Sequence, residues 1–262
     1  MTALAVIYAF AVWWSSTQAI IWFVRSAPRP ALNAFALVLA ILAAILAVMS
    51  TQEASVHAAF VGFTAGIGIW ASFEIAFLTG AILGYEAPAR SNRLSARAWS
   101  AFQAIAWHEA ALIATLAGLL IASIGTPNPT AAATFAALWI MRASAKLNLF
   151  LGVRNLCTEF LPGSVVHLSK HFRRSAMNGF FPFSVLSGTI AAAVLLRAAF
   201  DPASSPDHAT ASMLISTLVA LGILEHWLMI TPLSALDLWS GRDRRLGRAK
   251  LAQPLGKTRK FV

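Results

Sequence analysis

Residues 32–50 read LNAFALVLAILAAILAVMS and contain no charged side chain. A bilayer core is about 30 Å thick, so a membrane-spanning helix needs about 20 apolar residues. This stretch meets that requirement, and the rest of the chain has a similar character. Of its 262 residues, 58% are hydrophobic and only 11% are charged, whereas soluble domains carry about 25% charged residues. The sequence therefore predicts an all-α, polytopic membrane protein and excludes a soluble enzyme, a disordered chain and a disulfide scaffold.

Seven segments are long and apolar enough to span the bilayer, and prolines fall in most of the connections between them. The predicted transmembrane helices cover residues 3–24, 32–50, 56–83, 98–124, 130–152, 178–199 and 211–238. We expect one transmembrane domain over residues 1–240 and a basic tail over residues 241–262. The first segment lacks a basic start, so it is interpreted as a retained helix rather than a signal peptide.

The charges of the connections alternate along the chain. Basic residues follow the first, third, fifth and seventh segments: Arg25 and Arg29; Arg90, Arg93 and Arg97; Lys170, Arg173 and Arg174; and the Lys and Arg residues from Arg242 to Lys260. The other connections are neutral or acidic, with Glu53, Asp201 and Asp207. Because Lys and Arg accumulate in short cytoplasmic loops, we expect a periplasmic N-terminus and a cytoplasmic C-terminus. The net charge of +10 then indicates attraction to anionic lipids rather than to nucleic acid.

Two pairs of glycines in the third segment have the spacing of helix-packing motifs. Gly62 and Gly66 form one pair, and Gly80 and Gly84 form the other. Small residues four positions apart let helix backbones approach closely in lipid. We expect them to pack helices within this chain, with a dimer interface as the alternative.

Ionisable side chains lie near the middle of four predicted helices. They are Glu74; His108 and Glu109; Arg142 and Lys146; and Glu225 and His226. Counted from the cytoplasmic ends at 1.5 Å per residue, most of them fall in one layer roughly 14–20 Å deep. Lys146 lies one turn nearer the cytoplasm, from where its side chain can extend toward the head groups. Residues of this kind inside a membrane are costly and usually mark a function or an ion pair.

Four interpretations of this layer are open. Arg142 can pair with Glu74, Glu109 or Glu225 and only fix the helix packing. His108 and His226 can bind the magnesium of a tetrapyrrole. A metal or acid–base centre is the third possibility, with Glu74, His108, Glu109 and His226 as the ligands if a metal is bound. Transport is the fourth. The run His108–Leu112 (HEAAL) lacks the second histidine of the H-E-x-x-H motif, so the sequence does not indicate a zinc protease.

The connection before the sixth segment carries an amphipathic pattern. Residues 164–172 predict a short helix at the membrane surface, with Val165, Leu168 and Phe172 toward lipid and Lys170, Arg173 and Arg174 toward the head groups. A docking surface for a partner protein is the alternative. Earlier in the connection, Arg154 and Glu159 are spaced to pair across about one turn.

The same region resembles a known family. The runs that carry the resemblance are NLFLGVRNL (148–156), EFLP (159–162), FRR (172–174), MN (177–178), FP (181–182) and SV (184–185), together with HEAAL (108–112), HW (226–227) and PL (232–233). They are similar to the signature of PuhE, the photosynthetic complex assembly protein 2 of anoxygenic phototrophic bacteria. The resemblance covers almost the whole chain. Cys157 and Thr158 depart from the expected polar pair.

This resemblance implies a protein of the bacterial inner, photosynthetic membrane that assists maturation of the reaction centre and core light-harvesting antenna and influences bacteriochlorophyll supply. On this basis His108 and His226 are candidates to bind bacteriochlorophyll a or a precursor. Glu74, Glu109 and Glu225 would orient the imidazoles, and Arg142 would balance the carboxylates. Residues expected to contact lipids or photocomplex subunits are Arg154, Asn155, Glu159, Lys170, Arg173 and Arg174. The rivals are a membrane enzyme acting on a tetrapyrrole or quinone, and a scaffold whose polar layer consists of salt bridges.

Overall fold

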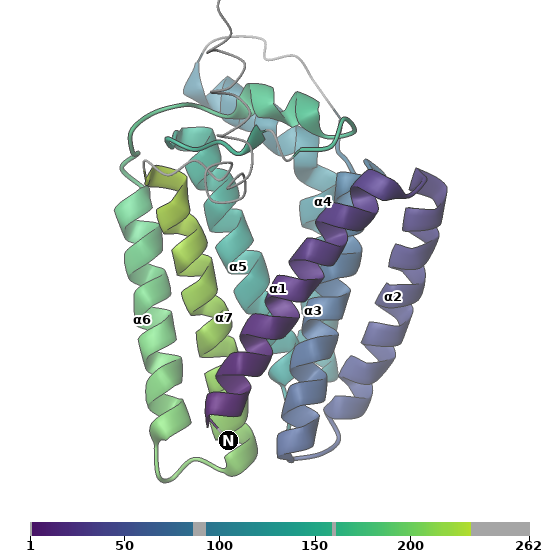
Figure 1. Ribbon diagram of the computed structural model, residues 1–262, viewed down its shortest axis with the longest axis vertical. Helices are drawn as coiled ribbons and strands as arrows, with labels where there is room; N and C mark the ends of the chain where they lie inside the picture. The colour runs from purple at the N-terminus through teal and green to yellow at the C-terminus, as the bar shows by residue number, and fades with distance from the viewer. Residues whose placement is uncertain (1, 86–92, 159–160, 232–262) are drawn as a thin grey trace, which may run out of the picture.

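The computed structural model describes residues 2–85, 93–158 and 161–231, and within these ranges it contains seven α-helices and no strand beyond one isolated bridge (Figure 1). The helices are α1 (Thr2–Ser26), α2 (Arg29–Ser50), α3 (Val56–Leu78), α4 (Leu94–Ala122), α5 (Thr130–Leu151), α6 (Phe181–Phe200) and α7 (Pro206–Ile230), with a short 3₁₀ helix, η2 (Val166–His171). The prediction of an all-helical chain is confirmed. All of these helices except α5 and η2, six in the described part of the chain, are long and apolar enough to cross a membrane.

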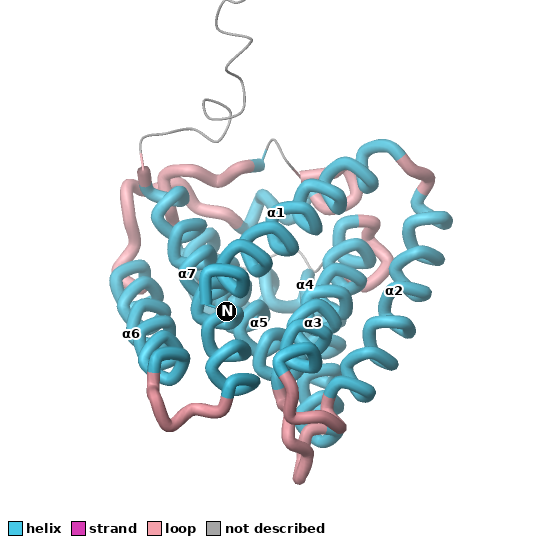
Figure 2. The backbone as a smooth tube through the Cα atoms, turned by 60° about the horizontal axis from the view of Figure 1, so that its bottom comes forward, coloured by secondary structure: helices cyan, strands magenta, loops and turns pink. Residues whose placement is uncertain are grey.

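Helices α3, α5 and α7 form the centre of the bundle. Helix α2 packs along α3, α6 packs along α7, and α4 contacts α3 and α5. Helix α1 runs obliquely across α3 and α7, so its two ends lie over different helices (Figures 1 and 2). Successive connections lie at opposite ends of the bundle (Figure 1). Consequently Arg25, Arg93 and Lys170 lie at one end, and Glu53 and Asp201 at the other.

The first glycine pair allows α3 and α5 to approach closely. A Cβ atom on Gly66 would lie 2.9 Å from the Ala131 carbonyl oxygen and 2.9 Å from the Thr134 Cβ. One on Gly62 would lie 3.2 Å from the Ala131 nitrogen. A side chain at either position would therefore push the two helices apart. The prediction that Gly62 and Gly66 pack helices within this chain is confirmed.

The second glycine pair does not form a helix-packing motif. Helix α3 ends at Leu78, earlier than the expected span over 56–83, because Gly80 turns the chain with a φ of +87°. Gly84 lies beyond this turn, where its nitrogen donates to the Ala104 carbonyl oxygen at 2.9 Å. Gly80 and Gly84 therefore do not form a motif within one helix, because the positive φ available to glycine is used at Gly80 to end α3. Gly84 does allow close packing within the chain, since a Cβ there would overlap the Gln103 carbonyl oxygen of α4.

The polar side chains of α5 explain why this central helix is less apolar than its neighbours. Arg142 and Lys146 point toward α3 and α4, where their acidic partners lie. On the other side, Ser144 contacts α7 and Asn148 contacts α6. A helix packed between several others can carry polar groups on two faces because those groups find partners on the neighbouring helices.

The connection between α5 and α6 is held by the side chain of Asn178. Its Nδ2 donates to the Gly152 carbonyl oxygen at 2.9 Å and to the Asn148 Oδ1 at 3.0 Å, both at the end of α5. Its Oδ1 accepts from the backbone nitrogens of Phe180 and Phe181, where α6 begins. Asn178 therefore closes one helix and starts the next.

Within residues 164–172, Val166–His171 form η2, and this segment packs against the bundle. Val165 is fully buried and Leu168 is 6% exposed, and both pack against Phe77 and Ala104. The Ser164 hydroxyl donates to the Leu78 carbonyl oxygen. The prediction that Val165 and Leu168 face lipid is wrong, because the apolar face of this amphipathic segment is covered by α3 and α4.

We expect Asn178→Ala to lower the free energy of unfolding by about 1–2 kcal/mol, the usual cost of losing a helix cap. Asn178→Asp should fall between this variant and the wild type, because it keeps the acceptor for α6 and loses the donors to α5. The unfolding midpoint of the purified protein in a denaturing detergent measures both effects. Met177→Ala, at a neighbouring position that is 51% exposed, is the control. Equal midpoints for Asn178→Ala and Met177→Ala would contradict the capping role.

Candidate functional site in the helix bundle

The polar layer predicted from the sequence is assembled around α5. Arg142 Nη2 lies 3.4 Å from Glu74 Oε2 on α3, and Lys146 Nζ lies 2.6 Å from Glu109 Oε1 on α4. Trp139, also on α5, donates its indole N–H to Glu109 Oε2 at 3.2 Å. Two carboxylates from different helices are thus held by one helix. The prediction that Arg142 pairs with a buried carboxylate is confirmed, with Glu74 as the partner.

An aromatic ring separates Lys146 from His108. The ammonium group of Lys146 lies 5.5 Å from the centroid of the Phe77 ring. The imidazole of His108 lies 4.5 Å from the same centroid, with the ring planes tilted by 41°. Phe77 therefore contacts both groups through its π system. Because Lys146 lies on α5, Phe77 on α3 and His108 on α4, these contacts connect three helices.

His108 is fully buried, and neither of its ring nitrogens has a hydrogen-bond partner among the described residues. It interacts electrostatically with Lys146, Glu109 and Arg142. Buried polar atoms without partners are uncommon in native proteins and call for an explanation. Both ring nitrogens of His108 therefore have unused bonding capacity among the described residues.

His226 differs from His108 because both of its nitrogens are engaged. Nδ1 lies 2.7 Å from the Gly222 carbonyl oxygen, which can only accept, so Nδ1 carries the proton. Nε2 then accepts from the Ser144 hydroxyl on α5 at 3.0 Å. The ring is 1% exposed. These bonds tie α7 to α5, with His226 as the link.

The polar layer is exposed at Arg142 and Glu225. The Arg142 side chain is 45% exposed, although its partner Glu74 is 9% exposed. Glu225 on α7 is also exposed and interacts electrostatically with both of them. The second oxygen of Glu74, Oε1, is buried and has no hydrogen-bond partner in the described part of the chain. Arg142 and Glu225 are therefore the members of the layer that a molecule from outside can reach.

In the described part of the chain, Glu74 and Glu109 bond to other partners than the imidazoles they were expected to orient. Glu74 bonds to Arg142, and Glu109 bonds to Lys146 and Trp139. In residues 2–85, 93–158 and 161–231, no group of three His, Cys, Asp or Glu side chains lies close enough to hold a metal ion. The four candidate metal ligands, Glu74, His108, Glu109 and His226, therefore do not converge on one point in this arrangement.

Both histidines are enclosed in this arrangement. His108 is covered on all sides, and both nitrogens of His226 are already bonded. Magnesium binding by His108 or His226 stays a prediction, which the absorption spectrum of the protein purified from a phototrophic host tests.

Most of the residues expected at the cytoplasmic surface lie in the connection between α5 and α6, where some have contacts within the chain. Asn155 Nδ2 donates to the carbonyl oxygens of Leu228 and Thr231, at the end of α7. Arg174 Nε donates to the Arg154 carbonyl oxygen at 3.3 Å. Arg173 lines a surface cavity of about 480 Å³ that also includes Ser175 and Asn178. Their contacts with lipids or partner subunits stay predictions. Glu159 and the basic tail over 241–262 lie outside the described residues.

The structure adds residues that the sequence did not single out. They are Phe77 and Trp139, which contact the charged groups, and Ser144 and Asn148, which join α5 to α7 and α6. Ser144 and Asn148 lie four positions apart, so they share a face of α5 that differs from the face of Arg142. The presence of two polar faces on α5 is the feature of the sequence that indicates contacts of this helix with further helices.

Comparison with known proteins places the chain in a family. Residues 1–245 match the family described as "Protein of unknown function (DUF3623)". A relative from Rhodobacter capsulatus, described as "Uncharacterized 30.4 kDa protein in puhA 5'region", is 36% identical over 240 residues, which cover 87% of this chain and 86% of the relative. No solved structure matches the chain. The chain therefore belongs to the DUF3623 family.

Proposed function

We propose that this protein is an assembly factor for photosynthetic complexes in the bacterial inner membrane, as its resemblance to the PuhE family implies. The observation that carries the proposal is the relative in the puhA 5' region of Rhodobacter capsulatus, a photosynthetic bacterium. The alignment covers most of both chains, so the similarity is not limited to one membrane helix. The role includes maturation of the reaction centre and core antenna and an influence on bacteriochlorophyll supply.

The proposal includes seven membrane spans with the N-terminus in the periplasm. Helix α5 would be the seventh span, and its position among α3, α4, α6 and α7 supports this, because Lys146, Ser144 and Asn148 on α5 bond to those neighbouring helices. The basic connections share one end of the bundle (Figure 1), which the positive-inside rule would place in the cytoplasm.

A bundle with an accessible charged pair at membrane depth suits a protein that handles membrane-embedded subunits. Charged groups inside a bilayer are costly unless they have partners. Arg142 and Glu225 keep exposed surface there, so they would gain from contact with polar atoms of an incoming photocomplex helix or of a pigment. While such a molecule is bound, the ion pair of Lys146 with Glu109 would hold α4 and α5 together.

Capture from membranes tests the proposal. We expect an affinity-tagged copy, expressed in a phototrophic host and solubilised gently, to enrich reaction-centre or core antenna polypeptides over a tagged, unrelated membrane protein of similar abundance. Quantitative mass spectrometry of the eluates measures the enrichment. Equal recovery of these polypeptides in both eluates would contradict the proposal.

The two ion pairs favour a second candidate, in which the polar layer only stabilises the bundle. In that case the double variant Arg142→Gln with Glu74→Gln should assemble photocomplexes as well as the wild type when both proteins are present at equal levels. A loss of assembly at equal protein levels and equal thermal stability would exclude this purely structural role.

A further inference from the structure

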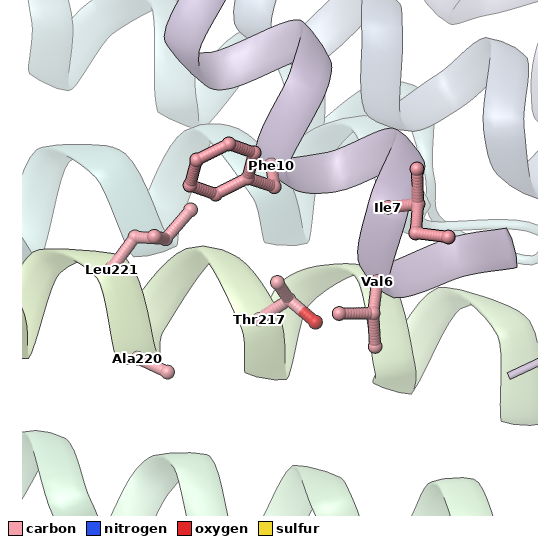
Figure 3. A pocket seen from close by; sticks show the side chains of 6 residues that line it. All are labelled: Val6, Ile7, Phe10, Thr217, Ala220 and Leu221. Atoms are coloured by element: carbon pink, nitrogen blue, oxygen red, sulfur yellow. The ribbon is translucent and has the colours of Figure 1, made fainter. Parts of the chain in front are cut away.

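An apolar groove of about 470 Å³ lies between α1 and α7 (Figure 3). It is lined by Val6, Ile7 and Phe10 of α1 and by Thr217, Ala220 and Leu221 of α7. The side chains from α1 keep much of their surface exposed, with values between 41% for Val6 and 66% for Ile7. The Thr217 hydroxyl donates to the Met213 carbonyl oxygen of its own helix at 2.8 Å. The groove therefore presents apolar surface and fits small-ligand volumes of about 300–1,000 Å³.

The upper end of the groove lies next to the open charged pair. Leu221 and Glu225 are four residues apart on α7, so they lie about 6 Å apart along one face of the helix. Helix α1 crosses the lower part of α7 and diverges from its upper part (Figures 1 and 2). Glu225, one turn beyond Leu221 on α7, is exposed and interacts electrostatically with Arg142.

The charges at this end favour a neutral polar group. An anionic head would meet the two carboxylates of Glu74 and Glu225, and a cationic head would meet the guanidinium of Arg142. An uncharged head with carbonyl and hydroxyl oxygens can accept a hydrogen bond from Arg142 and donate one to Glu225. Hydrogen bonds to charged groups are stronger than those between neutral groups, so such a head would be held firmly.

We infer that the groove and the exposed side chains of Arg142 and Glu225 together form a binding site for a neutral, lipid-soluble amphiphile. The alkyl or prenyl tail lies against Phe10 and Leu221, and the oxygen-bearing head reaches Arg142 and Glu225. Tailed quinones and long-chain alcohols share this chemistry. The site faces the lipid, so the ligand enters from the bilayer. This inference is independent of the assembly role, because it rests on the groove and the charges alone.

Photoaffinity labelling tests the site. The probe is a decyl-tailed quinone with a photoreactive diazirine in the tail, added to the purified full-length chain in lipid nanodiscs. We expect labelled peptides to concentrate in α1 and α7. Leu221→Trp and Ala220→Trp, which fill the groove, should reduce labelling at least about tenfold. Ile190→Trp, at a lipid-facing position of α6 that is 56% exposed, should leave labelling unchanged.

Competition and one further variant test the head group. Arg142→Gln should weaken binding about tenfold, the effect of losing one hydrogen bond to a charged group. Unlabelled decyl quinone should compete with the probe. If decanol also competes, long-chain alcohols are a second class of ligand for the site. Decane competing equally well would overturn the role of the head. Labelling spread over all lipid-facing helices, or unchanged by both tryptophan variants, would overturn the site.

Discussion

Replacing Glu109 with glutamine is expected to lower the free energy of unfolding by about 3–5 kcal/mol, the cost of breaking a buried ion pair from one side. Lys146 would lose the carboxylate at 2.6 Å and would keep its charge in a place where its side chain is only 21% exposed. Trp139 would lose the charged acceptor of its indole N–H. The unfolding midpoint in a denaturing detergent measures the change.

A second replacement at Lys146 should restore most of this loss. Glu109→Gln combined with Lys146→Met leaves no unpaired charge, and buried ion pairs can often be replaced by apolar residues at little cost. Glu53→Gln, at an exposed acidic position in the connection between α2 and α3, is the matched control and should have no effect. If the single Glu109 variant unfolds at the same midpoint as this control, the ion pair does not stabilise the bundle.

Gly66→Leu is the second variant with a large expected effect. A Cβ at this position already lies 2.9 Å from backbone and side-chain atoms of α5, so a leucine would force α3 and α5 apart. Overpacking of this kind costs about 1–3 kcal/mol, and it would also lengthen the contact between Arg142 and Glu74. We expect a lower unfolding midpoint and less protein in the membrane.

Gly118→Leu provides the matched control for this variant. Gly118 also lies inside a helix, α4, but a Cβ there would meet nothing within 4 Å. The replacement should therefore leave the midpoint near that of the wild type or raise it slightly, since glycine is a poor helix former. Equal destabilisation by both leucines would show that loss of glycine itself matters and that the close approach of α3 and α5 does not.

The polar layer could be predicted because helices that cross one bilayer end at similar heights. Counting from the cytoplasmic ends places Glu74, His108, Arg142 and Glu225 at one depth, and in the structure Glu74 and Glu225 both interact electrostatically with Arg142. The partners within the layer could not be predicted, since they depend on how each helix is rotated. His108 and Glu109 point about 100° apart, and only the packing decides that Glu109 meets Lys146.

The failures of prediction have the same origin. The alternation in residues 164–172 correctly indicated one apolar face, but it contained no information on what covers that face. Phe77 and Ala104 cover it in the structure, so Val165 is buried in protein. The hydrogen bond from Asn155 to the end of α7, which lies far away in the sequence, is likewise not indicated by any local pattern. Contacts between distant segments leave little trace in local patterns.

The near-infrared absorption of photosynthetic membranes tests the central claim most directly. A Rhodobacter capsulatus strain that lacks the 36% identical relative would be compared with the same strain carrying this chain, at equal cell density. We expect the deletion to reduce the bacteriochlorophyll bands of the reaction centre and core antenna, and this chain to restore them. Undiminished bands in the deletion strain would contradict a role in photocomplex assembly.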